Sequence, residues 1–118
     1  MARVLVCDDA AFIRMSLIKV LKEAGHEPVG EAGNGVEAFK KYVDLHPDVV
    51  LMDIRMKECD GVIGTRLIKE QFTKIKVIIL TTFKDKEYIQ DALKYGAFGY
   101  MLKDSSHDVI YEGIYRRS

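Results

Sequence analysis

The 118-residue sequence contains no tryptophan, only two prolines and only two cysteines. The cysteines, Cys7 and Cys59, are too few for a disulfide framework, and they lack the spacing of a metal site. This scarcity favours a reducing, intracellular setting, so we expect a cytoplasmic protein.

Long apolar runs and an excess of one charge are also missing. The apolar run after Met1 is too short for a signal peptide or a membrane span. Lys plus Arg and Asp plus Glu each number 18, which argues against a strongly cationic nucleic-acid binder. With 48% hydrophobic and 31% charged residues, the composition is that of a globular protein, and the length predicts one domain over residues 1–118.

Five short apolar runs recur along the chain and predict strands that are buried on both faces. They are Val4–Cys7, Val29–Ala32, Val49–Met52, Val77–Leu80 and Phe98–Leu102.

Segments with helical periodicity separate these runs. Ile13, Leu17, Val20 and Leu21 share one helical face, and Gly25 stands where a helix C-cap is expected. Asn34 followed by Glu37 resembles a capping box before a second helix. The remaining helices are marked by Val36, Phe39 and Val43 for the second, Gly64, Leu67 and Ile68 for the third, Ile89, Ala92 and Leu93 for the fourth, and Ser105 with Asp108 for the start of the fifth.

Strict alternation of strands and helices predicts parallel strands joined by right-handed crossovers, with helices on both faces. Five strands in so short a chain indicate a flavodoxin-like three-layer α/β fold with five helices. We expect the strand order 2-1-3-4-5, which the general rule for doubly wound sheets already associates with this fold.

Polar residues follow the expected strands at the edge where ligands bind in open parallel sheets. Asp8 and Asp9 follow the first strand, Asp53 ends the third, Thr81 follows the fourth and Lys103 follows the fifth. Each has an ordinary structural interpretation alone, such as a helix cap for the aspartates or a solvated charge for Lys103. Their shared position at one edge favours a functional site.

Three carboxylates at one edge repel one another unless a cation neutralises them. Oxygen ligands without His or Cys select a hard cation, Mg2+ first, with Mn2+ or Ca2+ as alternatives. A Mg2+ site with open coordination positions suits phosphoryl chemistry, in which an aspartate is a competent nucleophile. Lys103 and the Thr81 hydroxyl are suited to hold phosphoryl oxygens.

Four stretches resemble the receiver domains of two-component response regulators, over essentially the whole chain. They are Val4–Asp9, Val49–Met56 with Asp60 and Gly61, Val77–Phe83, and Gly96–Asp104. Thr82, Phe83 and the segment 102–104 are most similar to the subgroup with a C-terminal LuxR-type helix-turn-helix. Two positions depart from the family pattern, because Lys57 and Asp104 stand where proline is common.

This resemblance implies a role for each matched residue. Asp53 would be the phosphoacceptor, and Asp8 and Asp9 would bind Mg2+ with Asp53 and the backbone carbonyl of Arg55. The phosphoryl group would be contacted by Thr81, Lys103 and the backbone of Thr82, with Tyr100 as the switch residue. The implied partners are a sensor histidine kinase and a second copy of the chain on phosphorylation, with no membrane.

The function implied is a switch that catalyses its own phosphorylation and slow hydrolysis, without a conventional substrate. DNA-binding output would require a domain outside this chain, because the sequence stops at Ser118. The alternatives are a stand-alone receiver that acts through protein contacts, a pseudo-receiver that is never phosphorylated, and a small aspartate-nucleophile phosphatase. The phosphatase is disfavoured because Arg55 stands where that class places its acid/base aspartate.

Other residues are expected to be structural. Cys7 is predicted to be buried rather than a redox sensor. His26, His46 and His107 stand near expected helix ends, where solvated or capping roles are usual. Four tyrosines on the last two helices are expected to be mostly partly buried; they are Tyr88, Tyr95, Tyr111 and Tyr115.

Overall fold

Strands and helices alternate along the chain in a computed structural model that describes residues 1–54, 56, 60–81 and 86–102. The elements are β1 (Arg3–Cys7), α1 (Ala11–Glu23), β2 (Glu27–Ala32), α2 (Gly35–Leu45), β3 (Val49–Asp53), α3 (Gly61–Gln71), β4 (Lys76–Thr81), α4 (Lys86–Lys94) and β5 (Gly99–Leu102). The predicted fifth helix, from Ser105, lies outside the described residues.

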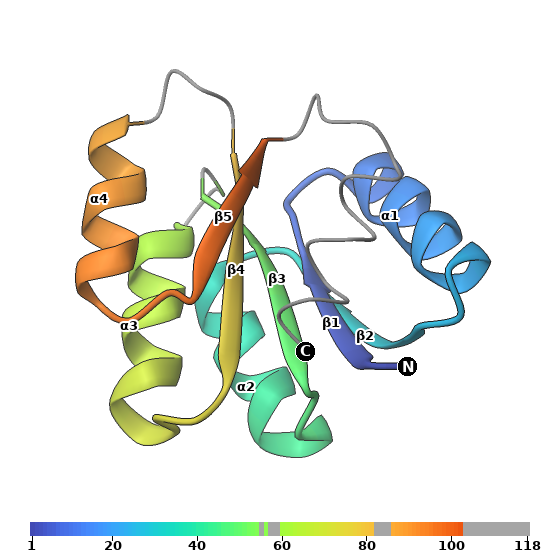
Figure 1. Cartoon of the computed structure of the whole chain (residues 1–118), viewed down its shortest axis with the longest axis horizontal. Coiled ribbons are helices and arrows are strands. Elements are labelled where there is room, and N and C mark those ends of the chain that lie inside the picture. The colour runs from blue at the N-terminus through green and yellow to red at the C-terminus, as the bar shows by residue number, and fades with distance from the viewer. Residues whose placement is uncertain (55, 57–59, 82–85, 103–118) are drawn as a thin grey trace.

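The five strands form one parallel sheet in the order β2-β1-β3-β4-β5, which confirms the predicted topology. Helix α1 covers one face of the sheet, and α3 and α4 lie on the other side (Figure 1). The weakly apolar second strand lies at an edge, as expected, and a register irregularity falls between Val4 and Leu5 where it pairs with β1.

Alternate strand residues build two separate cores. Val6, Leu51 and Leu80 pack with Leu17 and Leu21 of α1 on one face. The intervening residues pack against α2, α3 and α4 on the other face, among them Leu5, Val50, Ile79, Ala38, Tyr42 and Ile68. Burial of both faces explains why the strands are continuous apolar runs rather than alternating ones.

Two of the predicted helix ends have the expected caps. Asn34 Oδ1 accepts a hydrogen bond from the backbone N–H of Glu37 at 2.9 Å, which begins α2. After α1, Gly25 adopts a φ of 85°, and the N–H of His26 donates to the carbonyl of Leu21 at 2.9 Å. This is the Schellman pattern, in which the chain leaves the helix through a residue in the left-handed conformation. That conformation favours glycine at this position.

The expected buried face of α2 is partly wrong. Val36 and Val43 are exposed, whereas Ala38 and Tyr42 are buried and Phe39 packs partly against the core. The Tyr42 ring packs 4.6 Å, centroid to centroid, from the ring of Phe72. Aromatic packing thus decides which face of α2 is buried, and the valines of the expected face point to solvent. Burial also raises the pKa of Tyr42.

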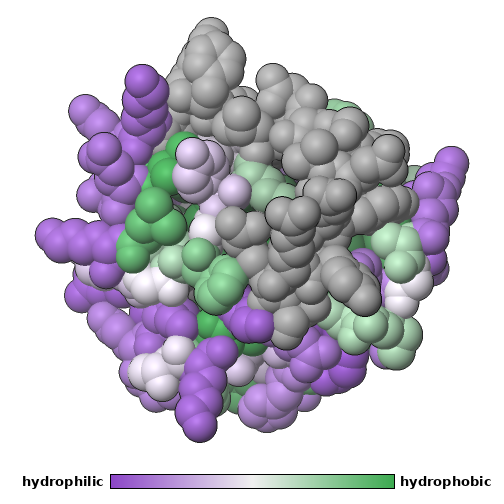
Figure 2. Space-filling model, in the orientation of Figure 1, coloured by the Kyte–Doolittle hydropathy of each residue, from purple (hydrophilic) through white to green (hydrophobic). Residues whose placement is uncertain are grey.

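One further expectation fails for a physical reason. His26 is buried rather than solvated, because its Nδ1 accepts the backbone N–H of Ala2 at 3.0 Å. Of the four tyrosines, Tyr88 and Tyr95 are 41% and 40% exposed, and the Arg66 guanidinium lies 5.5 Å from the centroid of the Tyr95 ring. Tyr111, Tyr115 and His107 lie outside the described residues. Figure 2 shows hydrophobic surface among the hydrophilic side chains on the side where α4 lies.

None of the helices in the described ranges is long and apolar enough to span a membrane.

Candidate functional site

Three carboxylates meet at the carboxyl edge of the sheet. Because Cys7 of β1 pairs with Met52 of β3 in parallel register, the residues that follow them, Asp8 and Asp53, emerge side by side. One carboxylate oxygen from each of Asp8, Asp9 and Asp53 lies within 4.8 Å of the other two. Sheet topology therefore brings together residues that are 45 positions apart (53 − 8) in the sequence.

Two of these carboxylates are removed from solvent. Asp8 is 1% exposed and Asp53 is 3% exposed, whereas Asp9 is exposed at the rim. Asp8 is held by its backbone N–H, which donates to the carbonyl of Ala32 at 3.0 Å, and by its Oδ1, which accepts the N–H of Ala10 at 2.9 Å. These two hydrogen bonds hold Asp8 in its place in the cluster.

Burial and nearby carboxylates act on the thiol of Cys7, the residue that precedes Asp8. Cys7 is fully buried, and burial raises the pKa of its thiol, with smaller contributions from the nearby Glu37 and Asp8 carboxylates. A thiol held protonated in this way is a poor nucleophile. This confirms the prediction of a buried, structural Cys7.

Thr81 and Tyr100 lie on one face of the sheet. Thr81 ends β4 and is 1% exposed, and it pairs with Leu102, while Tyr100 pairs with Ile79 two residues earlier. Paired residues of parallel strands share a face, and so do residues two apart. Tyr100 is 48% exposed, so its ring borders solvent on the face that Thr81 shares.

Three of the predicted site residues lie outside the described residues. They are Arg55, Thr82 and Lys103. The two departures from the family pattern, Lys57 and Asp104, lie outside them as well, so their predicted roles stay predictions.

Arg14 contacts the site, although the sequence did not single it out. Its Nη1 donates to the backbone carbonyl of Asp8 at 2.6 Å, and its Nε forms an ion pair with Glu31 of β2 at 3.0 Å. The side chain therefore ties α1 and the edge strand to the loop that carries the acidic pair. In the sequence it is only one of many polar residues on a helix, because its partners are distant along the chain.

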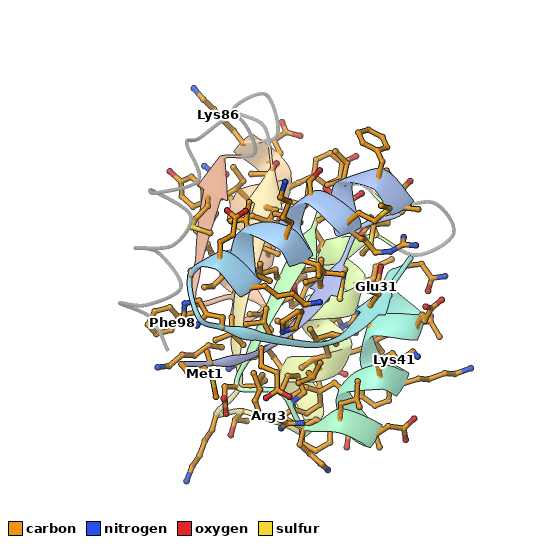
Figure 3. The ribbon with its side chains drawn as sticks, turned by 90° about the vertical axis from the view of Figure 1, so that its right-hand side faces the viewer. Met1, Arg3, Glu31, Lys41, Lys86 and Phe98 are labelled. Atoms are coloured by element: carbon orange, nitrogen blue, oxygen red, sulfur yellow. The ribbon has the colours of Figure 1, made fainter. Side chains whose placement is uncertain are left out.

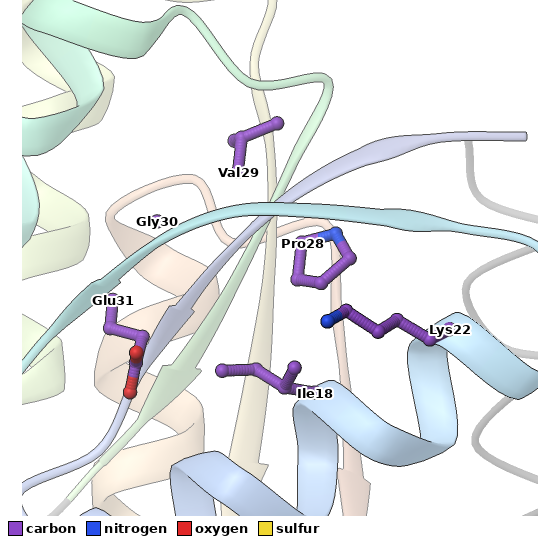
Figure 4. A pocket seen from close by; sticks show the side chains of 6 residues that line it. All are labelled: Ile18, Lys22, Pro28, Val29, Gly30 and Glu31. Atoms are coloured by element: carbon purple, nitrogen blue, oxygen red, sulfur yellow. The ribbon is translucent and has the colours of Figure 1, made fainter.

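A hollow of about 350 Å³ lies between α1 and β2, beside this ion pair (Figure 4). It is lined by Ile18, Lys22, Pro28, Val29, Gly30 and Glu31. Figure 3 shows Glu31 beside α1, away from the labelled Arg3 at the opposite end of the sheet.

Comparison with known protein families identifies the family to which this fold belongs. Residues 4–115 match the model of the response regulator receiver domain. The chain belongs to this receiver domain family. The match spans nearly the whole chain and includes every residue of the acidic cluster.

Individual relatives agree with this assignment. The chain is 44% identical over 115 residues to the transcriptional regulatory protein LnrK of Bacillus subtilis, covering 97% of the chain and 52% of LnrK. It therefore spans about half the length of that relative. The solved receiver domain of the putative response regulator NarL from Mycobacterium tuberculosis is 29% identical with a TM-score of 0.91, covering 98% of this chain and 94% of that one.

A second solved structure is a complex that contains BeF3 and Mg2+. The CheX–CheY–BeF3–Mg2+ complex from Borrelia burgdorferi includes a chain that is 25% identical, with a TM-score of 0.90. The alignment covers 97% of this receiver and 87% of that chain. The receiver fold described above is therefore shared with the putative response regulator NarL and with a chain of a complex that contains CheY.

Proposed function

We propose that this receiver is a phosphorylation-controlled switch in which Asp53 accepts a phosphoryl group from a sensor histidine kinase. The observation that carries the proposal is the cluster of Asp8, Asp9 and Asp53, two of them buried, within 4.8 Å at the carboxyl edge of the sheet. Buried carboxylates this close repel one another, and a bound cation would relieve that repulsion. Membership in the receiver family supports the same chemistry.

The donor set of the cluster fits Mg2+. Asp8, Asp9 and Asp53 offer only carboxylate oxygens, which hard cations prefer, and the backbone carbonyl of Arg55 is the proposed fourth ligand. Bound Mg2+ would neutralise the charge that develops on the phosphoryl oxygens during transfer. The complex that contains CheY, BeF3 and Mg2+ supports this choice of metal.

Asp53 is the nucleophile of the proposed step. One of its carboxylate oxygens attacks the phosphorus of a phosphohistidine; an O–P bond forms, the P–N bond breaks, and the departing imidazole keeps the bonding electrons. The product is an acyl phosphate on Asp53 and a neutral or protonated histidine on the kinase. Water later cleaves the acyl phosphate, which returns the carboxylate and releases inorganic phosphate.

The neighbouring residues would bind the phosphoryl group and respond to it. The Thr81 hydroxyl and the Lys103 ammonium would each contact one phosphoryl oxygen, with the backbone of Thr82 close by. Tyr100 shares a sheet face with Thr81, which supports its proposed role as the residue that changes rotamer when Thr81 moves. The added charge shifts an existing equilibrium between two surfaces rather than creating a new one.

The output we propose is control of transcription in the cytoplasm, through a DNA-binding domain that lies outside these 118 residues, with dimerisation on phosphorylation. The similarity to LnrK, of which this chain spans about half, supports this proposal. A stand-alone receiver that acts by protein contacts is the alternative. It is favoured by the CheY chain of Borrelia burgdorferi, of which the alignment covers 87%.

The proposal is tested by intact-protein mass spectrometry after incubation with a small acyl phosphate and Mg2+. We expect one phosphoryl adduct in the wild type and none in Asp53→Asn, because an amide is not a competent nucleophile here. The matched control is Asp60→Asn, which replaces an aspartate that caps α3, and it should still be modified. An unmodified wild type, or an adduct that survives Asp53→Asn, would contradict the proposal.

A further inference from the structure

The first residue of α3 lies against the backbone of Asp53. A Cβ atom at Gly61 would stand 2.1 Å from the carbonyl oxygen of Asp53 and 2.9 Å from both the carbonyl carbon of Asp53 and the Cα of Ile54. Contacts shorter than 3.0 Å are essentially never made by real Cβ atoms. Because all three atoms belong to the main chain, none can rotate away, so only glycine allows this approach.

Hydrogen bonds hold the same segment from two sides. The N–H of Gly61 donates to the carbonyl of Ile54 at 2.9 Å, and the N–H of Ile54 donates to the carbonyl of Leu80 in β4 at 3.2 Å. Ile54 is fully buried. The residue next to Asp53 is therefore fixed between the start of α3 and the neighbouring strand.

The first turn of α3 is fixed independently of this contact. Asp60 Oδ1 accepts the N–H of Ile63 at 2.9 Å and so caps the helix. A capped, rigid helix start lying directly on a carbonyl transmits any shift of the helix to that carbonyl. The carboxylate of Asp53 is attached to the same Cα, so its distance from Asp8 and Asp9 depends on how closely α3 approaches.

We propose that Gly61 is a positioning residue for the reaction of Asp53. Its missing side chain lets α3 rest on the Asp53 main chain, and this contact sets where the Asp53 carboxylate stands in the acidic cluster. The inference rests on the proposed function for the identity of the reaction. Relief of a 2.1 Å contact requires a displacement on the order of 1 Å, and a misplacement of that size costs on the order of 100-fold in rate.

The test compares Gly61→Ala with Gly64→Ala in the same helix. A Cβ at Gly64 would stand 2.9 Å from the Cα of Gly35 and 3.0 Å from the end of the Met52 side chain. Gly64→Ala therefore strains the contact between α2 and α3 without touching the backbone of Asp53. Circular dichroism and urea unfolding establish that both variants are folded before they are compared.

Gly61→Ala is expected to weaken Mg2+ binding, measured by calorimetry, by about tenfold or more and to slow modification by a small acyl phosphate by about 100-fold. Gly64→Ala should remain within about twofold of the wild type in both measurements, since its strain does not reach the acidic cluster. Wild-type behaviour of Gly61→Ala, or equal losses in the two variants, would overturn the inference.

A second pair of variants serves if Gly61→Ala does not fold. Asp60→Ala and Asp60→Asn remove the same charge, but only the alanine removes the cap, because asparagine caps as well as aspartate. We expect Mg2+ to bind severalfold more weakly to Asp60→Ala than to Asp60→Asn, since an uncapped α3 no longer holds Asp53 in place. Equal affinities in this pair would overturn the inference.

Failure of this inference can be told apart from failure of the proposed function. A wild type that is not modified counts against the proposed function alone. The position of Asp53 is then read from metal-free crystal structures, in which Gly61→Ala should move the Asp53 carboxylate by on the order of 1 Å relative to Asp8. An unmoved carboxylate would overturn the role of Gly61, whatever the reaction.

Discussion

His26 shows how one buried side chain makes stability depend on pH. Its Nδ1 accepts the N–H of Ala2, and only a neutral imidazole has a free nitrogen to do so. Burial, together with the nearby amino terminus, lowers the pKa of His26 below its ordinary value of 6.5. The unfolded chain therefore takes up a proton at a higher pH than the folded protein does.

We predict that the free energy of unfolding falls as the pH drops below about 6.5, because protonation of His26 then favours the unfolded chain. The contribution is complete above that pH and is lost progressively toward the lower pKa of the folded state. Urea unfolding at about pH 8 and about pH 5.5 measures the slope. His26→Asn, whose Oδ1 can accept the same N–H without titrating, should reduce it.

The control for this prediction is His46→Asn, which removes an exposed imidazole at a left-handed position that asparagine tolerates. If the two variants lose the same slope, the dependence does not belong to His26. The sequence placed both histidines near helix ends but could not distinguish them. The burial of His26 is set by contact with Ala2, which is 24 residues away.

At the scale of the element, the C-terminal end of helix α2 is capped by a side chain from strand β1. Arg3 of β1 donates from Nη1 to the carbonyl of His46 at 2.8 Å and from Nη2 to the carbonyl of Leu45 at 2.9 Å. His46 itself adopts a φ of 45°, a left-handed conformation that usually favours glycine. A guanidinium at a helix C-terminus also opposes the negative end of the helix dipole.

We predict that Arg3→Met destabilises the protein by about 1–2 kcal/mol, because two hydrogen bonds from a charged donor are lost while the apolar stem is kept. Chemical denaturation measures the change. Arg66→Met is the matched control, since Arg66 is exposed and, within the part of the chain that the structure describes, its guanidinium contacts Glu70 of the same helix and the Tyr95 ring. Its loss should be smaller, and an equal loss would argue against the capping role of Arg3.

Local patterns predicted where the elements lie better than which faces they bury. The apolar runs and caps located each described strand and helix to within a few residues. The α2 stripe of Val36 and Val43 was wrong because Tyr42, which counts as only weakly apolar, packs on Phe72 across the chain. Pair contacts of this kind have no signal in a single periodicity.

At the scale of the whole molecule, topology explains both the success and the limit of the sequence analysis. Alternating elements predict a doubly wound parallel sheet, and the strand order associated with that fold brings Asp8, Asp9 and Asp53 to one edge. The contacts of Arg14 and Gly61 were missed because they depend on how closely packed elements approach, to a fraction of an ångström. The pattern of residue types along the sequence does not indicate how closely two elements approach each other.

The acidic cluster should also link metal binding to the stability of the entire fold. Any ligand that binds only the folded state stabilises it, and Mg2+ at about ten times its dissociation constant contributes about 1.4 kcal/mol. For a domain of this size we predict a rise in Tm of roughly 3–6 °C. Scanning calorimetry with and without MgCl2, at ionic strength matched with NaCl, measures it.

Variants then show whether the stabilisation arises at the cluster. Asp8→Asn should lose most of the Mg2+-dependent rise, because it removes one of the two buried carboxylates from the group that lies within 4.8 Å. Asp60→Asn removes the same charge at the start of α3 and should keep the rise if the cation sits among Asp8, Asp9 and Asp53. A rise that persists in Asp8→Asn would mean that Mg2+ acts elsewhere on the folded surface. Because the cluster joins the ends of β1 and β3, which are neighbours within the sheet, a cation held there opposes the separation of these two strands.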